Sequence, residues 1–177
     1  MNKQLSTKRL CRAGIIASLY VALTYAFMPF AFGPFQLRPA EALCILPLFF
    51  PEAIPALCVG CALSNLTSPY AFYDVLFGTG ATLIAALGSY MVGRFFKKDF
   101  IKIVVGGLFP VLCNALIIPF VIVFLCGGAE GYASVTTAYF AFFASIFLTE
   151  CLWVYALGTP LYFGVKRLRA RNLPFFV

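Results

Sequence analysis

The chain has 177 residues, of which 63% are hydrophobic, 18% aromatic and 11% charged, and its formal net charge is +7. A soluble domain of this length could not bury so much apolar surface, so the composition excludes a soluble globular protein and indicates an integral membrane protein. The sequence contains no histidine, which excludes histidine-based catalysis. We expect a single all-α membrane domain over residues 1–177.

The first charge-free stretch, residues 13–37, predicts a transmembrane helix over residues 9–31, since about 20 apolar residues cross the hydrocarbon core. The run is too long for a signal peptide and lacks a small-residue cleavage site, so we expect this helix to stay in the protein. Ala13 and Ala17 lie four residues apart near its start, with Gly14 and Ser18 beside them. Small residues at this spacing let another helix approach closely, and packing inside the protein is their commoner role.

Two short helices are predicted next, over residues 38–50 and 53–66, separated by the prolines of Pro51-Glu-Ala-Ile-Pro55. Each piece can cross the bilayer only if it is tilted or if the membrane thins. A re-entrant pair is the alternative. Glu52, between the two prolines, is expected to lie in a solvated turn.

Arg38 and Glu41 stand at the start of the first short helix, in an otherwise apolar segment. Ionisable groups at membrane depth are costly and commonly mark a cavity, a pathway or an ion pair. Their i,i+3 spacing allows a local salt bridge. A local pair and a place in a substrate cavity therefore both remain open for these residues.

Three further helices are predicted over residues 72–95, 102–126 and 134–165. Twelve of the 13 basic residues fall in three clusters: Lys3, Lys8, Arg9 and Arg12; Arg94, Lys97, Lys98 and Lys102; and Lys166, Arg167, Arg169 and Arg171. Basic residues in short loops stay in the cytoplasm, so all three clusters are assigned to the inside. An even number of crossings then separates each cluster from the next. We expect six transmembrane helices with both termini cytoplasmic and helices 2 and 3 short; a four-helix count would give the same sidedness.

Several polar residues lie within or beside the predicted helices and need partners. Glu150 lies 16 residues before Lys166, or about 24 Å along a helix, and Trp153 follows one turn later on the same side. We interpret this pair as part of a ligand site. The amides of Asn65 and Asn114 require hydrogen bonds from a neighbouring helix or a ligand. Asp74 precedes a helix, where the helix dipole would favour its carboxylate.

The chain lacks the motifs of several enzyme classes. It has no phosphate-binding GxxxxGK[ST] loop, no plausible nucleophile and base pair, and no metal-ligand cluster. Cys58 and Cys61 have a CxxC spacing, but they lie in an apolar helix without histidine or a second CxxC, and the seven cysteines are best interpreted as small apolar residues. We therefore expect no catalytic residues, no metal and no cofactor in this chain.

Residues 32–86 carry a more specific pattern. It comprises Gly33-Pro34 followed by Arg38 and Glu41, the FPEAIP turn at 50–55, and the series Asn65, Ser68-Pro69-Tyr70, Asp74 and Gly78. Together these residues resemble the QueT family of queuosine-precursor transporters, and the resemblance extends over nearly the whole chain. The family is similar to the substrate-binding S components of energy-coupling factor (ECF) transporters.

This resemblance implies six helices with both termini inside, in the plasma membrane of a bacterium. It also implies an ECF module as partner, made of a transmembrane coupling subunit and two ATPases that carry ATP and Mg²⁺. In such S components an AxxxA face on helix 1 docks onto the coupling subunit, which would assign Ala13 and Ala17 to docking. Ala22 and Ala26 share the spacing, but their depth in the helix argues against that role.

The resemblance implies a 7-deazaguanine cargo, such as queuine or its 7-cyano or 7-aminomethyl precursors. A carboxylate suits the N1–H and 2-amino edge of such a ring, an amide or backbone donor suits O6, and aromatic faces stack on the base. The candidates are Glu150 or Glu41 for the carboxylate, Asn65 or Asn114 for the amide, Trp153, Tyr70 or Tyr139 for stacking, and Asp74 or Glu130 for an aminomethyl cation.

Two other functions remain open from the sequence. One is an S component with another vitamin-like substrate. The other is a membrane enzyme acting on lipid or peptide, against which the missing catalytic constellation argues. The lipid bilayer is expected to surround the chain, and no nucleic acid is expected as a partner.

Overall fold

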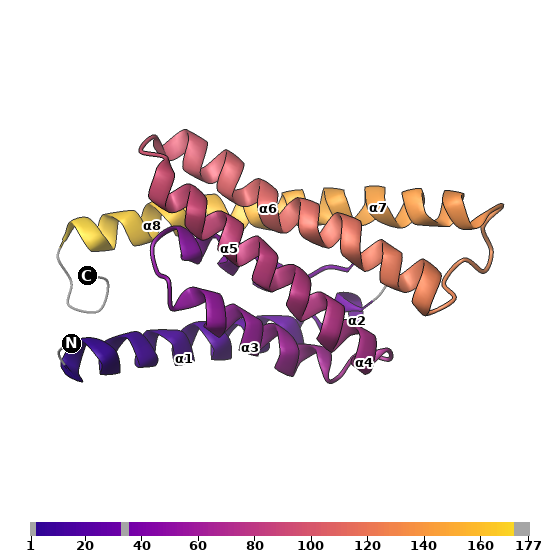
Figure 1. The fold of residues 1–177 in the computed structure, drawn as a ribbon, viewed down its shortest axis with the longest axis horizontal. Coiled ribbons are helices and arrows are strands. Elements are labelled where there is room, and N and C mark those ends of the chain that lie inside the picture. Colours follow the sequence, from indigo (N-terminus) through magenta and orange to yellow (C-terminus); the bar gives the residue numbers. More distant parts are fainter. Residues whose placement is uncertain (1–2, 33–35, 172–177) are drawn as a thin grey trace.

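A computed structural model describes residues 3–32 and 36–171, and the described residues form helices without strands (Figure 1). Gly33 and Pro34 lie outside the described residues. The α-helices are α1 (Lys3–Ala26), α2 (Met28–Ala31), α3 (Ala53–Asn65), α4 (Ala71–Tyr73), α5 (Thr79–Phe95), α6 (Asp99–Phe120), α7 (Val135–Cys151) and α8 (Gly158–Ala170). A 3₁₀-helix, η1 (Pro39–Leu48), and three π-helical segments, η2 (Asp74–Gly78), η3 (Val121–Leu125) and η4 (Leu152–Leu157), complete the order.

Three continuous helical runs in the described part of the chain are long and apolar enough to cross a membrane: Ala71–Phe95, Asp99–Leu125 and Val135–Ala170. Each contains one π-helical segment. These runs correspond to the helices predicted over 72–95, 102–126 and 134–165. They begin or end up to five residues from the predicted limits, because charged residues at either end continue the helices beyond their apolar part.

The helix predicted over residues 9–31 is divided in the structure. α1 starts earlier, at Lys3, and ends at Ala26, and the short α2 follows with Pro29 in its first turn. Proline suits the first turn of a helix because its missing N–H would lack a helical partner there. α1 has 24 residues, but the basic Lys8, Arg9 and Arg12 occupy its first half.

The segment predicted as an α-helix over 38–50 is instead the ten-residue 3₁₀-helix η1, and all ten residues are buried. Pro39 opens this helix, and Pro47 within it offers no N–H to a helical hydrogen bond. η1 contacts α1, α3, α5, α6, η4 and α8, so it forms the centre of the bundle. At about 2.0 Å per residue it is about 20 Å long, less than the roughly 30 Å of a hydrocarbon core.

Two glycines allow the helices around this centre to approach closely. A Cβ atom on Gly60 of α3 would lie 2.9 Å from Cβ of Tyr20 and 3.1 Å from the carbonyl oxygen of Ala17, both on α1. A Cβ on Gly93 of α5 would lie 2.5 Å from the carbonyl oxygen of Leu48. Larger residues at these positions would push α1 and η1 away from their neighbours.

The three basic clusters meet at one end of the molecule. The start of α1, the turn between α5 and α6, and the end of α8 lie together at the left of Figure 1. The connection between η3 and α7, which is rich in glycine, lies at the opposite end. The fold therefore has one basic end. The prediction that all three basic clusters lie on the cytoplasmic side requires such an arrangement.

Candidate binding site

The buried carboxylate of Glu41 lies in the centre of the bundle and is only 2% exposed. The hydroxyl of Tyr20, on α1, donates to its Oε1 over 2.5 Å, and the thiol of Cys44 donates to its Oε2 over 3.2 Å. Glu41 is placed here because η1 runs through the interior with every side chain buried. Both carboxylate oxygens thus have donors from the protein.

Arg38 precedes η1 and is also buried, at 5% exposure. Its Nε donates to the carbonyl oxygen of Ala31 over 2.9 Å, and its guanidinium lies 4.9 Å from the ring centroid of Phe32. The ion pairs among the described residues are Arg12–Glu52 and Lys166–Asp99, so the local Arg38–Glu41 salt bridge is not formed there. The charges of Glu41 and Asp74 nevertheless act on Arg38.

Glu150, near the end of α7, is 4% exposed and meets Asn114 of α6. Nδ2 of Asn114 donates to Oε1 of Glu150 over 2.9 Å. The second oxygen of Glu150, Oε2, is buried and has no donor among the described residues. A buried carboxylate oxygen without a donor is costly, so this atom is a candidate to accept a hydrogen bond from a ligand.

Trp153 follows Glu150 by three residues, in η4. Its indole Nε1 is buried and has no acceptor among the described residues. The ring makes an edge contact with Phe27, with centroids 6.1 Å apart. Short π-helical segments often occur at functional sites. One buried acceptor and one buried donor that lack partners in the described part of the chain therefore come from residues one helical turn apart.

Asn65, at the end of α3, meets Asp74, at the start of η2. Nδ2 of Asn65 donates to the backbone oxygen of Asp74 over 2.7 Å, while its Oδ1 is buried without a donor in the described part of the chain. The hydroxyl of Ser68 bonds to the carboxylate of Asp74. A Cβ on Gly78 would lie 2.7 Å from Nδ2 of Asn65, so glycine is needed there to leave room for the amide.

Electrostatic interactions connect these groups into one buried polar cluster. The charges of Glu41 and Arg38 act on Glu150, and that of Asp74 acts on Arg38. With Asn114 bonded to Glu150, the cluster joins three carboxyl groups, one guanidinium and one amide. These are five of the residues predicted from the sequence: Arg38 just before η1, Glu41 in η1, Asp74 in η2, Asn114 in α6 and Glu150 in α7.

Tyr70 and Tyr139, predicted to stack on a base, lie on the outer surface. Tyr70 is 51% exposed. Tyr139 is half-buried, bonds through its hydroxyl to the carbonyl oxygen of Leu116 over 3.3 Å, and packs against Phe124 and Phe140. The structure therefore places neither ring in the buried polar cluster.

Ala13 and Ala17, predicted to dock a partner, are half-buried and pack against a core that includes Ile16 and Leu57. The adjacent Gly14 and Ser18 are exposed. Ala13 and Ala17 thus lie at the edge of the contact between α1 and the interior. Gly14 and Ser18 extend this row of small residues onto the surface.

Several residues of the site were not predicted from the sequence. Tyr20 and Cys44 hold Glu41, yet each looks like an ordinary member of an apolar run. Glu52 lies in a turn as expected, but the prediction that it is solvated is wrong. Its Oε1 accepts a hydrogen bond of 2.7 Å from Arg12, and the side chains of Glu52 and Arg12 are 10% and 7% exposed. A charged residue between two prolines was the signal that Glu52 needs a partner.

Metal binding has no support among the residues that the structure describes, since no group of three or more His, Cys, Asp or Glu side chains could hold an ion. The polar cluster instead presents hydrogen-bond donors and acceptors. Long apolar helices surrounding such a cluster define a helical membrane protein with a candidate site for a small polar molecule.

The comparison with protein families identifies the particular family. The sequence model described as QueT transporter matches residues 10–167, and the chain therefore belongs to the QueT transporter family. It is a membrane transport protein rather than an enzyme. No curated protein and no solved structure matches the chain.

Proposed function

We propose that this protein is the substrate-binding S component of an ECF transporter and that it captures a 7-deazaguanine queuosine precursor for uptake. The observation that carries the proposal is that two buried polar atoms, Oε2 of Glu150 and Nε1 of Trp153, have no hydrogen-bond partner within residues 3–32 and 36–171. A guanine-like edge presents N–H donors at N1 and the 2-amino group beside the acceptor O6. The Glu150 carboxylate would accept from the donors, and the indole N–H would donate to O6.

Glu150 suits the guanine edge better than Glu41 does. Both oxygens of Glu41 already accept hydrogen bonds, from Tyr20 and Cys44. Glu150 has one oxygen bonded to Asn114 and the other free for a ligand among the described residues. We assign recognition of the base to Glu150 and a supporting role to Glu41.

The carboxyl groups of the buried polar cluster favour a cargo with an additional amino group. The cluster has three of them, on Glu41, Asp74 and Glu150, and one guanidinium, on Arg38. An ammonium group donates strong hydrogen bonds to carboxyl oxygens. The 7-aminomethyl precursor carries such a group, whereas the 7-cyano precursor does not, so the aminomethyl compound is the preferred substrate in this proposal.

The proposed topology has six crossings with both termini in the cytoplasm of a bacterial cell. The gathering of the three basic clusters at one end of the molecule supports this sidedness (Figure 1). η1 and α3 have 10 and 13 residues and would be the two short crossings. η1 is enclosed by longer helices, whereas α3 exposes one face, with Val59 53% and Leu63 47% exposed.

The proposed partner is an ECF module whose two ATPases bind ATP and Mg²⁺. Ala13 and Ala17 would dock its coupling subunit, supported by the exposed Gly14 and Ser18 beside them, since together they form a broad small-residue surface on α1.

A ligand panel tests the substrate. Purified protein is heated with queuine, its 7-cyano and 7-aminomethyl precursors, guanine and unrelated vitamins, and the unfolding temperature is measured. Binding to the folded state raises that temperature. We expect the largest increase with the aminomethyl compound. Stabilisation by an unrelated vitamin, with none from any deazaguanine, would refute the assigned cargo.

A further inference from the structure

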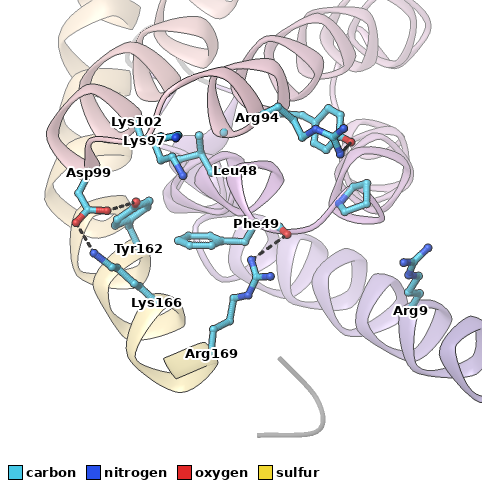
Figure 2. Close-up of a pocket in the computed structure, with 13 residues that line it drawn as sticks. Arg9, Leu48, Phe49, Arg94, Lys97, Asp99, Lys102, Tyr162, Lys166 and Arg169 are labelled. Atoms are coloured by element: carbon cyan, nitrogen blue, oxygen red, sulfur yellow. Dashed lines mark hydrogen bonds and ion pairs between the residues drawn. The ribbon is translucent and has the colours of Figure 1, made fainter. Parts of the chain in front are cut away.

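A cavity lies at the basic end of the molecule, apart from the residues of the proposed substrate site. Its volume is about 610 Å³. Leu48, Phe49 and Tyr162 form part of its wall (Figure 2). Cationic side chains come to it from α1, the end of α5, the loop after it, α6 and α8: Arg9, Arg94, Lys97, Lys102, Lys166 and Arg169. We call this cavity the basic pocket.

The positive charge of the basic pocket is poorly neutralised. Among the described residues that line it, Asp99 is the only acid, against six cations. Asp99 is already engaged, because the hydroxyl of Tyr162 donates to its Oδ1 over 2.9 Å and Lys166 pairs with its Oδ2. The pocket thus carries a formal excess of five positive charges, six minus one.

Two guanidinium groups at the basic pocket, those of Arg169 and Arg94, donate hydrogen bonds to neutral groups. Arg169 donates to the carbonyl oxygen of Phe49 over 3.4 Å (Figure 2). Its guanidinium also lies 5.9 and 5.7 Å from the ring centroids of Phe49 and Phe50. Arg94 donates to the hydroxyl of Tyr90 over 3.4 Å. These contacts orient the cations without cancelling their charge, so the pocket remains attractive to an anion.

Exposed aromatic residues lie beside the basic pocket, as expected of a surface at the level of lipid headgroups. Phe95 and Phe100 flank the loop that contains Lys97 and are each 77% exposed. Phe163, on α8 beside Lys166, is 49% exposed. Apolar rings next to lysines are typical of the boundary between the hydrocarbon core and water. Phosphate groups of lipids lie at this depth.

We propose that the basic pocket binds a phosphate-bearing anion, with the headgroup of an anionic membrane lipid as the source that its position favours. Phosphate oxygens would accept hydrogen bonds from the free N–H groups of lysine and arginine around the pocket. Basic pockets between helices at a membrane surface bind lipid headgroups by this chemistry. The proposal is independent of the cargo, because the pocket shares no residue with the buried polar cluster.

The chain offers matched variants for a test. The pocket triple, Arg9→Gln with Lys97→Gln and Lys102→Gln, removes three charges that line the cavity. The control triple, Lys8→Gln with Lys98→Gln and Arg171→Gln, removes three charges that do not line it. Each triple lowers the net charge from +7 to +4, that is 7 − 3. Arg169 and Lys166 are kept because they contact the wall.

Native mass spectrometry of the full chain in neutral detergent would measure binding of phosphatidylglycerol, phosphatidylcholine and inorganic phosphate. We expect the wild type to prefer phosphatidylglycerol, and the pocket triple to weaken that binding at least about tenfold while the control triple changes it little. Binding of inorganic phosphate that the pocket triple alone loses, without a lipid preference, would identify a soluble phosphate as the ligand of the same site. Equal losses in both triples, or no binding of either phosphate source, would overturn the proposal.

Discussion

At the scale of single residues, Glu150 is the side chain on which the proposed recognition of the base depends most. Glu150→Gln replaces one carboxylate oxygen with an amide nitrogen, which donates hydrogen bonds and cannot accept one from the ligand. We expect binding of the 7-aminomethyl precursor to weaken by about 1.5–3 kcal/mol, the scale of a hydrogen bond to a charged group. Isothermal titration calorimetry would measure the change. The control is Asp99→Asn, the equivalent substitution at a carboxylate outside the buried polar cluster. Unchanged affinity in Glu150→Gln would move the role to Glu41.

Tyr20 is the residue that holds the second buried carboxylate. Tyr20→Phe removes the hydroxyl that donates to Glu41 and leaves a buried carboxylate oxygen short of a donor. We expect the free energy of unfolding to fall by about 1–3 kcal/mol, seen as a lower unfolding temperature without ligand. Tyr25→Phe is the matched control, because Tyr25 lies on the same helix and is 44% exposed. Equal stability of the two variants would contradict the role given to Tyr20.

At the scale of elements, the close contact between α1 and α3 keeps Tyr20 in place. Gly60→Ala would put a methyl group 2.9 Å from Cβ of Tyr20, so the helices must separate. Overpacking of this kind destabilises by about 1–3 kcal/mol. Gly80→Ala on α5 is the control, because nothing lies within 4 Å of an added Cβ there. A Gly60→Ala protein as stable as the control, with unchanged ligand affinity, would show that this contact is not tight.

The elements also show how far sequence reasoning reached. The three long helical runs and the need of Asn114 for a partner could be predicted, because apolar length and an unpaired amide are local signals. The 3₁₀ form of η1 could not be predicted. A short apolar run fits a buried α-helix as well as a buried 3₁₀-helix, and packing decides which of the two forms. The bond between Tyr20 and Glu41 joins residues 21 positions apart and depends on how α1 lies against η1.

At the scale of the whole molecule, docking to a coupling subunit would take place on α1. Ala13→Trp with Ala17→Trp would fill the space that a partner helix needs, and we expect the variant to lose co-purification with the ECF module. Because both alanines also touch the core, ligand binding by the variant must be measured as a check on its fold. Ala144→Trp, at an exposed position of α7, should keep both functions. Retained assembly in the double variant would exclude docking at this pair.

The central claim is that this transporter encloses a 7-deazaguanine base, and its most direct test is the identity of the bound small molecule. The wild-type chain would be purified from cell membranes and denatured, and the released compounds would be identified by mass spectrometry, with Glu150→Gln treated in parallel. We predict a 7-deazaguanine from the wild type and much less of it from the variant. Release of a chemically unrelated compound from the wild type, reduced in the variant, would contradict the account.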